Sequence, residues 1–195
     1  MAVKIAITGN IASGKSQVER YIQELGYVVY DSDEIAHEVL SEIKDFYGFD
    51  VFASGKIDRK KLGKLVFSNL DLKKKLEEAT HPKIKEKILE LFELHKNDNF
   101  IFISVPLLFE AGFESIFDKI ILITVDNKLQ LSRLMNRNNL TEKEALSRMN
   151  SQIPQDKKIS KSDYIIENNS TVENLLKQVD FVLSELNKPD YFSKG

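Results

Sequence analysis

The chain has 195 residues, of which 42% are hydrophobic and 30% are charged. This length suits one globular domain with a sizeable core, which hides roughly 70% of the unfolded chain's surface. Lys and Arg number 28 against 30 Asp and Glu, so the net charge of -2 gives no overall basic excess to attract nucleic acid or a membrane surface. The sequence contains no cysteine, which excludes disulfides, thiolate zinc sites and a cysteine nucleophile.

No apolar run in the sequence approaches the length of a membrane span, and the chain enters a strand directly after Met1. Repeats of fixed period and low-complexity linkers are also absent from the sequence. We therefore expect a cytoplasmic protein that is a monomer or a weak homo-oligomer and that has neither membrane nor nucleic acid as a partner.

The first distinctive stretch has the order strand, glycine loop, helix. An apolar strand at 2–8 leads into G-x-x-x-x-G-K-S at 9–16, and a helical pattern follows. This spacing is that of a P-loop, in which backbone N–H groups surround a phosphate, a lysine reaches its outer oxygens and a hydroxyl binds Mg²⁺. An ordinary glycine-containing βα turn is the alternative, although a chance match is on the order of one in a hundred. We expect nucleotide phosphates at Gly9, Asn10, Ile11, Ala12, Ser13, Gly14, Lys15, Ser16 and Gln17.

Two carboxylates follow the second predicted strand, at 27–30. Asp31 and Asp33 precede a helical pattern that is clear from Ile35, so either could cap that helix by accepting a backbone N–H. In an α/β protein of this type, however, the carboxyl end of the second strand borders the crevice where ligands bind. The sequence therefore favours a chemical role for one of the two carboxylates.

The alternation of strands and helices then stops for about fifty residues. A turn at 55–59 is expected to open a helix that ends near Phe67, and a charged helix follows at 71–79. Pro82 suits the first turn of a third helix, with His81 just before it. We interpret this segment as a helical insertion, in which a phosphotransferase can build the pocket for its second substrate.

Three further apolar runs, at 100–105, 119–125 and 163–167, are typical of parallel strands covered on both faces. With the first two strands they predict an α/β fold with a five-stranded parallel sheet. The loop after the third strand, at 106–110, also lies at the ligand crevice. An amphipathic helix is expected from Thr171 to Leu186, followed by a frayed tail.

Arginines follow the fourth predicted strand. Arg133 and Arg137 lie four residues apart in a helix and so share one face, with an ordinary exposed pair as the alternative. After a polar break, residues 141–144 have the pattern of a capping box, which opens a helix that contains Arg148 and Gln152. We interpret the two helices as a mobile flap.

Several chemistries use a P-loop. A GTP switch needs Asn-Lys-x-Asp, whereas residues 127–130 end in Gln130, whose neutral amide cannot accept hydrogen bonds from guanine as a carboxylate does. A kinase needs a phosphate cradle, Mg²⁺, a base near the acceptor hydroxyl and arginines in a site closed against water, all of which this sequence can supply. A regulatory protein whose P-loop senses a nucleotide without transferring phosphate is the alternative from another class.

The ordered motifs resemble those of the dephospho-CoA kinase family. They are GNIASGKS at 9–16, DSDEIAH at 31–37, GKIDR at 55–59, THP at 80–82, VPLLFE at 105–110 and QLSRLMNR at 130–137. Arg148, Gln152 and DYIIEN at 163–168 continue the match, so that about 160 residues are covered. Single motifs such as His-Pro are weak, whereas the ordered set is highly specific.

The resemblance implies the nucleoside monophosphate kinase fold, a P-loop three-layer α/β sandwich with a helical substrate-binding insertion and a helical lid. It implies one kinase domain over 1–195, with its core at about 1–35, 98–134 and 160–187, the insertion at about 36–97 and the lid at about 135–159. The implied reaction moves the ATP γ-phosphoryl group to the ribose 3'-hydroxyl of dephospho-CoA, the last step of coenzyme A synthesis. Another small-molecule or nucleotide kinase of this fold is the alternative.

The resemblance also implies roles for single residues. Lys15 and the P-loop backbone would hold the ATP phosphates, Ser16 would bind Mg²⁺, and Asp33 would be the base for the 3'-hydroxyl. Arg133 would lie near the adenine, Arg137 and Arg148 would meet the phosphates as the flap closes, and Asn168 would border the adenine. The groups implied for the CoA-side substrate are Asp33, Arg59, His81, Pro106 and Leu107. For His81, a hydrogen bond at the start of the helix is the alternative.

One position departs from the family pattern. Many family members, and many P-loop proteins, have an acidic residue at the end of the third strand, where this chain has Ser104. A serine adds no charge to the Mg²⁺ shell, so either water bridges there or Asp31 takes that role. Asp31 is therefore a candidate metal-site group.

Overall fold

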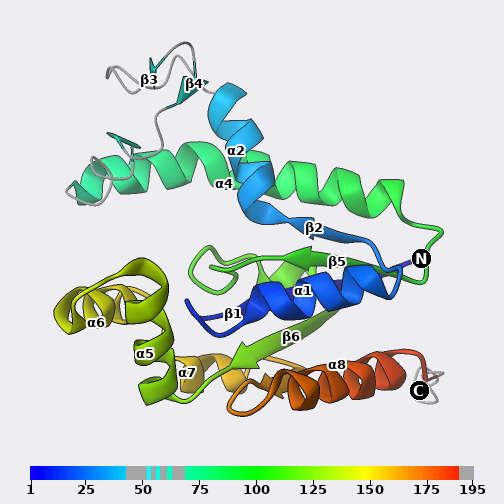
Figure 1. The fold of residues 1–195 in the computed structure, drawn as a ribbon. Coiled ribbons are helices and arrows are strands. Elements are labelled where there is room, and N and C mark those ends of the chain that lie inside the picture. Colours follow the sequence, from blue (N-terminus) through cyan, green and yellow to red (C-terminus); the bar gives the residue numbers. More distant parts are fainter. Residues whose placement is uncertain (43–51, 54–55, 58–60, 63–68, 189–195) are drawn as a thin grey trace. The chain divides into compact units, whose positions relative to one another are not determined.

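The computed structural model describes residues 1–42, 52–53, 56–57, 61–62 and 69–188 (Figure 1). The chain forms two compact units, one from Met1–Tyr30 and Asp98–Gly195 and the other from Asp31–Asn97. We call the first the P-loop unit and the second the insertion unit. The predicted helix at 59–67 lies largely outside the described residues, as does most of the predicted frayed tail.

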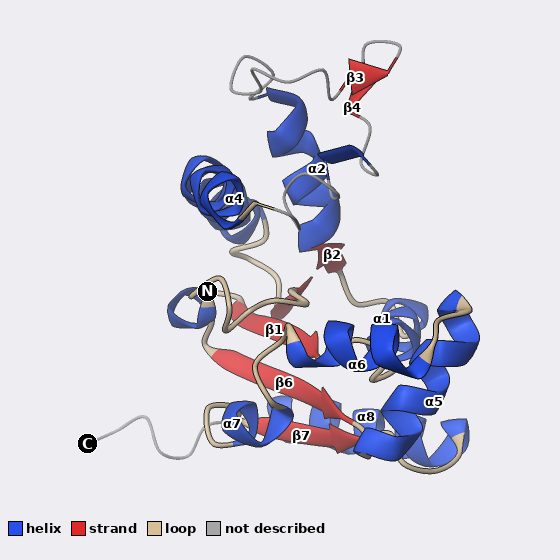
Figure 2. Ribbon diagram, turned by 90° about the vertical axis from the view of Figure 1, so that its left-hand side faces the viewer, coloured by secondary structure: helices blue, strands red, loops and turns tan. Residues whose placement is uncertain are grey.

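The P-loop unit is built on a five-stranded sheet with the strand order β2-β5-β1-β6-β7 (Figure 2). The strands are β1 (Val3–Gly9), β2 (Val29–Asp31), β5 (Phe100–Ser104), β6 (Lys119–Thr124) and β7 (Tyr164–Glu167). The central strand β1 pairs in parallel with β5 and β6, and β6 pairs in parallel with β7. The predicted α/β fold with its five-stranded parallel sheet is confirmed.

The helices of this unit are α1 (Lys15–Glu24), α5 (Asn127–Asn138), α6 (Glu142–Asn150), α7 (Gln155–Ile159) and α8 (Val172–Leu186), with a 3-10 turn at Glu114–Ile116. Helix α1 buries Val18 and Ile22 in the same core cluster as Val179 of α8 and Phe102 of β5. Each fully buried aliphatic or aromatic side chain stabilises the fold by roughly 1.5–3 kcal/mol. Because this core holds α1 against the sheet, both ends of the loop between β1 and α1 are fixed.

The start of α6 agrees with the sequence. The Thr141 hydroxyl accepts the Glu144 backbone N–H at 3.4 Å and the Glu144 carboxylate accepts the Thr141 N–H at 2.9 Å, so the predicted capping box is confirmed. Hydrogen bonds from the Thr141 side chain and backbone lower the pKa of Glu144.

The end of α6 differs from the expectation. The helix ends at Asn150, so Gln152 lies beyond it, and the prediction that Gln152 belongs to this helix is wrong. Beyond the helix, the Gln152 side chain accepts the Ile11 N–H at 2.7 Å, and Pro154 disfavours helical backbone at Ile153. The short helix α7 then begins directly after this proline and was not predicted.

The insertion unit contains α2 (Ser32–Glu42), a hairpin of β3 (Phe52–Ala53) and β4 (Lys56–Ile57), and the long helix α4 (Leu70–Leu94). Helices α2 and α4 pack together. Lys87 of α4 lies 2.8 Å from Glu42 and 3.4 Å from Glu38, both of α2. The hydrogen bond between Lys87 and Glu42 raises the pKa of the lysine and lowers that of the glutamate.

Helix α4 corrects the expectation of two helices separated at Pro82. Asn69 caps the helix by accepting the Leu72 N–H at 3.0 Å, and the helix then continues through Pro82 to Leu94. The proline removes the hydrogen bond to the Glu78 carbonyl, but Glu78 is exposed and water can satisfy that group. Ile84 and Ile88, which follow the proline, are buried, and their burial offsets the loss.

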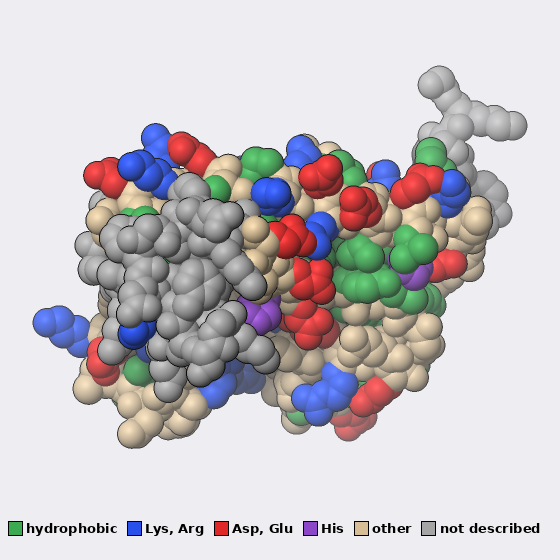
Figure 3. All heavy atoms as spheres, turned by 90° about the horizontal axis from the view of Figure 1, so that it is seen from above, with side chains coloured by type: hydrophobic (Ala, Val, Ile, Leu, Met, Phe, Trp, Pro, Cys, Tyr) green, Lys and Arg blue, Asp and Glu red, His purple; other side chains and the backbone are tan. Residues whose placement is uncertain are grey.

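Helix α4 carries three consecutive exposed lysines, Lys73, Lys74 and Lys75. Lys73 and Lys74 approach Glu77 and Glu78 at 3.7 and 3.9 Å, in i,i+4 pairs. Charged side chains of both signs also lie next to one another over the face seen in Figure 3. Among the described helices, none combines the length and the apolar character needed to cross a membrane.

Candidate active site

The P-loop conformation accounts for both of its glycines. Gly14 has φ 96° and ψ 14°, a left-handed conformation, and a Cβ there would lie 2.0 Å from the Asn168 side-chain nitrogen. A Cβ on Gly9 would lie 2.6 Å from the Ser13 hydroxyl and 2.7 Å from the Ile123 carbonyl oxygen. Helix α1 begins at Lys15, so its first N–H groups have no partner within the helix and are available to an anion.

Replacing Gly14 by alanine is expected to destabilise the protein and to abolish nucleotide binding. The left-handed backbone costs an alanine about 1–2 kcal/mol, and its Cβ displaces the Asn168 amide. The measurement is thermal unfolding with and without ADP and Mg²⁺. Gly26→Ala is the matched control, because Gly26 has φ 89° but a Cβ added there would meet no atom within 4 Å beyond its chain neighbours. A Gly14→Ala protein with an undiminished ADP-dependent rise in Tm would contradict this account of the loop.

Asn168 supports the loop from the end of β7. Its side chain donates to the Ser13 carbonyl at 2.8 Å and its oxygen accepts from Arg133 Nη2 at 3.5 Å, and the residue is only 4% exposed. Arg133 Nη1 and the Ser13 hydroxyl are buried and make no hydrogen bond within the described part of the chain. A buried guanidinium nitrogen without an acceptor is costly in a folded protein. An anionic or polar ligand beside the loop would supply that acceptor.

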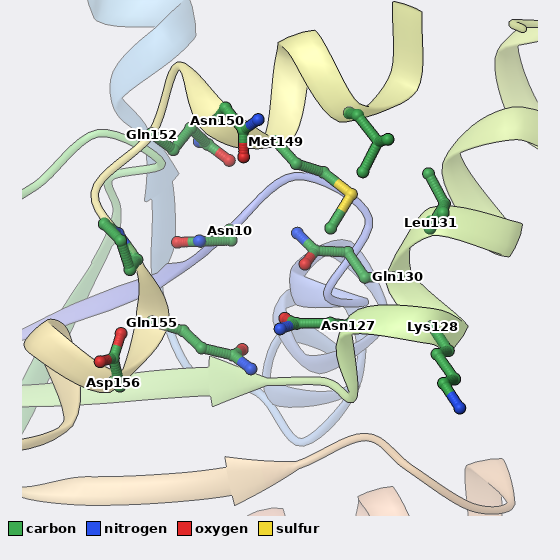
Figure 4. A pocket seen from close by; sticks show the side chains of 12 residues that line it. Asn10, Asn127, Lys128, Gln130, Leu131, Met149, Asn150, Gln152, Gln155 and Asp156 are labelled. Carbon is green, nitrogen blue, oxygen red and sulfur yellow. The ribbon is translucent and has the colours of Figure 1, made fainter. Parts of the chain in front are cut away.

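The first half of the loop is held by segments that follow β6. Gln130 of α5 donates to the Ile11 carbonyl at 2.8 Å, and the Gln152 side chain accepts the Ile11 N–H at 2.7 Å. Figure 4 shows Asn10, Gln130, Gln152 and Met149 around one cavity, whose volume is about 560 Å³. Gln130, which excluded guanine recognition in the sequence, therefore has a structural function in fixing the P-loop.

A buried lysine joins the loop to α7. The Lys158 side chain is fully buried and its ammonium donates to Asn10 Oδ1 and to Glu110 Oε1, both at 2.8 Å. Glu110 also accepts the Ile153 N–H at 2.9 Å. No sequence pattern indicated this lysine, because Lys158 lies in a short polar segment that resembles an exposed one.

The P-loop lysine makes a second compact cluster. Lys15 Nζ lies 2.5 Å from Glu19 Oε1 and 2.5 Å from the Ser104 hydroxyl, which in turn donates to the same Glu19 oxygen. Glu19 was not predicted as a site residue. Its spacing of four from Lys15, which puts both on one face of α1, was the available signal.

The remaining candidates of the P-loop unit lie on helices and on one loop. Arg133 and Arg137 are on α5, where Arg137 Nε donates to Asn138 at 3.1 Å, and Arg148 is on α6, which packs against α5. Arg137 and Arg148 are exposed. Pro106 and Leu107 follow β5, and Leu107 is 48% exposed.

The other candidates belong to the insertion unit or to residues that are not described. Asp31 Oδ1 accepts the Asp33 N–H at 2.8 Å at the start of α2, so Asp31 makes the capping interaction considered in the sequence. Asp33 is exposed in the first turn of α2, and His81 is half-buried in α4. Arg59 lies outside the described residues. Over the described ranges, no three His, Asp or Glu side chains gather into a preformed metal site.

Comparison with known proteins agrees with this geometry. The family model described as dephospho-CoA kinase matches residues 3–174, which is most of the chain. The chain belongs to the dephospho-CoA kinase family. A curated relative, the dephospho-CoA kinase of Listeria monocytogenes, is 41% identical over 189 residues that cover 92% of this chain and 94% of the relative. The chain is thus an ATP-dependent phosphotransferase of the last step of coenzyme A synthesis.

Solved structures agree with the family assignment. Dephospho-CoA kinase from Campylobacter jejuni is 36% identical with a TM-score of 0.74, and the match covers 95% of this chain and 98% of that one. The protein TT1252 from Thermus thermophilus is 33% identical with a TM-score of 0.81 and coverages of 96% and 99%. Both matches span the P-loop unit and the insertion unit, so the similarity extends well beyond the P-loop.

Proposed function

We propose that this member of the dephospho-CoA kinase family moves the γ-phosphoryl group of ATP to the ribose 3'-hydroxyl of dephospho-CoA, with the P-loop as the nucleotide site. The observation that carries the proposal is the geometry around Gly14 and Lys15. The loop leaves no room for a Cβ, the helix presents its free N–H groups, and Arg133 Nη1 lacks an acceptor among the described residues. The first two features suit a bound polyphosphate, and the third suits a ring-nitrogen acceptor of the adenine.

The donor set of the P-loop unit fits Mg²⁺. Ser16 directly follows Lys15 in the first turn of α1 and is exposed, so its hydroxyl is available as an oxygen ligand, the type that Mg²⁺ prefers. Asp31, from the insertion unit, is proposed to act on a metal-bound water and not on the metal itself; its Oδ1 accepts the Asp33 N–H. When bound there, Mg²⁺ would offset the negative charge of the nucleotide phosphates.

Asp33 is the proposed base. Its backbone N–H is held by Asp31, which fixes the first turn of α2 and with it the origin of the Asp33 side chain. A carboxylate is in general a weak base towards a ribose hydroxyl. Asp33 therefore aligns the 3'-hydroxyl and accepts its proton late, as bond formation to phosphorus proceeds.

The nucleotide site is completed by arginines of the proposed lid at about 135–159. Arg137 and Arg148 neutralise the transferred group when the lid closes, and both residues are exposed. Arg133 and Asn168 border the adenine. The Asn168 side chain also donates to the Ser13 carbonyl, so the same residue joins the proposed adenine site to the P-loop.

The groups proposed for the acceptor come from the loop after β5 and from the insertion at about 36–97. These groups, which hold the CoA-side substrate, are Arg59, His81, Pro106 and Leu107. Leu107 has 48% of its surface exposed, which suits a ligand contact. We further propose a cytoplasmic enzyme, monomeric or weakly oligomeric, whose partners are small molecules; the net charge of -2 supports the absence of a nucleic-acid partner.

The decisive experiment measures ADP formation by the purified protein with dephospho-CoA, with nucleoside monophosphates and with no acceptor. We expect strong stimulation by dephospho-CoA alone, and phosphate at the 3' position of the product by NMR. Stimulation by a nucleoside monophosphate instead would indicate another kinase of this fold. Nucleotide binding without stimulation by any acceptor would indicate a regulatory protein and would overturn the proposal.

A further inference from the structure

The cluster of Lys15, Glu19 and Ser104 contains a carboxylate at an unexpected place. We propose that Glu19, in addition to Asp31, supplies from helix α1 the negative charge that P-loop enzymes take from an acidic residue at a strand end. In this role Glu19 is a positioning residue, which orients Lys15 and the water around Mg²⁺ bound at Ser16. The proposal rests on the Mg²⁺-dependent reaction proposed above.

The need for such a residue follows from the end of β5. P-loop enzymes hold Mg²⁺ with the loop Ser or Thr and with an aspartate that follows a neighbouring strand. Here β5 lies directly beside β1, Ser104 pairs with Ile7, and β5 ends at Ser104. The Ser104 hydroxyl carries no charge, so the end of β5 alone cannot balance the positive charges of Mg²⁺ and Lys15.

The geometry brings Glu19 to that position. Residues three and four apart in a helix are neighbours, with about 5–6 Å between their Cβ atoms, so Glu19 lies next to both Ser16 and Lys15. Its Oε1 accepts a hydrogen bond from Ser104 at 2.5 Å, so the carboxylate contacts the very side chain that stands at the strand end. The Ser104 hydroxyl thus links the end of β5 to the charged Glu19 carboxylate on α1.

The environment of Glu19 differs from that of an ordinary surface pair. Its side chain and that of Lys15 are each 14% exposed, whereas the i,i+4 pair of Lys74 and Glu78 is 78% and 64% exposed. Removing two charges from water costs free energy, which a simple helix pair does not recover. Among the described residues, Glu19 Oε2 has no hydrogen-bond partner, so one oxygen remains available to a metal-bound water.

The alternative is that Glu19 withholds Lys15 from the nucleotide. In that case removal of the carboxylate frees the lysine and strengthens nucleotide binding. The two roles therefore predict opposite changes for the same substitution.

The test titrates Mg²⁺ at fixed ADP and records the rise in Tm, a readout independent of turnover. In Glu19→Gln, which keeps the size and hydrogen-bonding oxygen of the side chain, we expect the Mg²⁺ concentration for half of the full rise to increase about tenfold. The double variant Glu19→Ala with Ser104→Asp, which returns the charge to the strand end, is expected to recover most of this loss. Glu24→Gln is the matched control, since Glu24 is exposed at the end of the same helix.

Three outcomes overturn the proposal. If Glu19→Gln needs the same Mg²⁺ concentration as the wild type, the carboxylate does not support metal binding. If it needs less Mg²⁺, the carboxylate keeps Lys15 away from the nucleotide. The double variant Glu19→Ala with Ser104→Asp overturns the proposal if it has the wild-type Tm without ligand and still needs more Mg²⁺. That result shows that a carboxylate at the strand end cannot replace Glu19. A wild-type protein with no Mg²⁺-dependent rise in Tm would instead contradict the proposed metal use itself.

Discussion

The Asp33→Asn variant is expected to lower kcat by about 10²- to 10⁴-fold, the range for loss of a general base. Asparagine has the shape of aspartate but cannot accept the proton of the 3'-hydroxyl at neutral pH. The backbone hydrogen bond from residue 33 to Asp31 is unaffected, and residue 33 is exposed, so the start of α2 is preserved. The measurement is steady-state ADP formation with dephospho-CoA, together with ADP binding by calorimetry.

The control for this prediction is Glu34→Gln. Glu34 is the next residue in the first turn of α2 and is exposed, so the substitution removes the same charge without touching Asp33. We expect Glu34→Gln to retain turnover within about threefold, since exposed substitutions have small effects. Turnover of Asp33→Asn at a similar level, with ADP affinity unchanged, would rule out Asp33 as the base.

The Lys158→Met variant is expected to lose about 3–5 kcal/mol of unfolding free energy, the cost of breaking a buried ion pair from one side. Methionine fills the volume of the lysine side chain. However, the Glu110 carboxylate and the Asn10 amide oxygen then lose the ammonium group that donates to them. The measurement is urea unfolding followed by circular dichroism. Lys157→Met, at an exposed position of the same helix, is the control and is expected to change stability little.

A second substitution separates lost charge pairing from lost packing. Glu110→Gln removes the carboxylate charge that Lys158→Met leaves unpaired, and the glutamine side-chain oxygen can still accept the Ile153 N–H. Adding it to Lys158→Met is therefore expected to recover much of the lost stability, because replacing both partners of a buried pair is often nearly neutral. A double variant less stable than Lys158→Met, or a single variant as stable as Lys157→Met, would contradict the assigned role of the pair.

Local patterns carried much of the fold prediction. The glycine spacing at 9–16, the continuous apolar strands and the capping box at 141–144 each depend on neighbours within a few residues, and each was found as predicted. The errors arose where distant contacts override local preference. Pro82 predicts a helix start, but burial of Ile84 and Ile88 keeps α4 continuous.

The site shows the same division. Lys15 and Ser16 could be chosen because their spacing within the loop has a chemical meaning by itself, whereas Arg133 was implied by the resemblance to the family. Lys158 and Gln152 could not, since each acts on Asn10 or Ile11, more than 140 positions away in the sequence. A hydrogen bond over such a separation leaves no local pattern.

The sequence by itself determined that a phosphate-binding loop starts an α/β fold and, through its ordered motifs, that the chain resembles dephospho-CoA kinases. Only the tertiary structure decided which side chains hold that loop and which carboxylate lies beside Ser104. The physical reason is that a strand end and a helix face come together only when the sheet and α1 share one core. Glu19 and Ser104 are 85 residues apart in the chain, yet their side chains form one hydrogen bond.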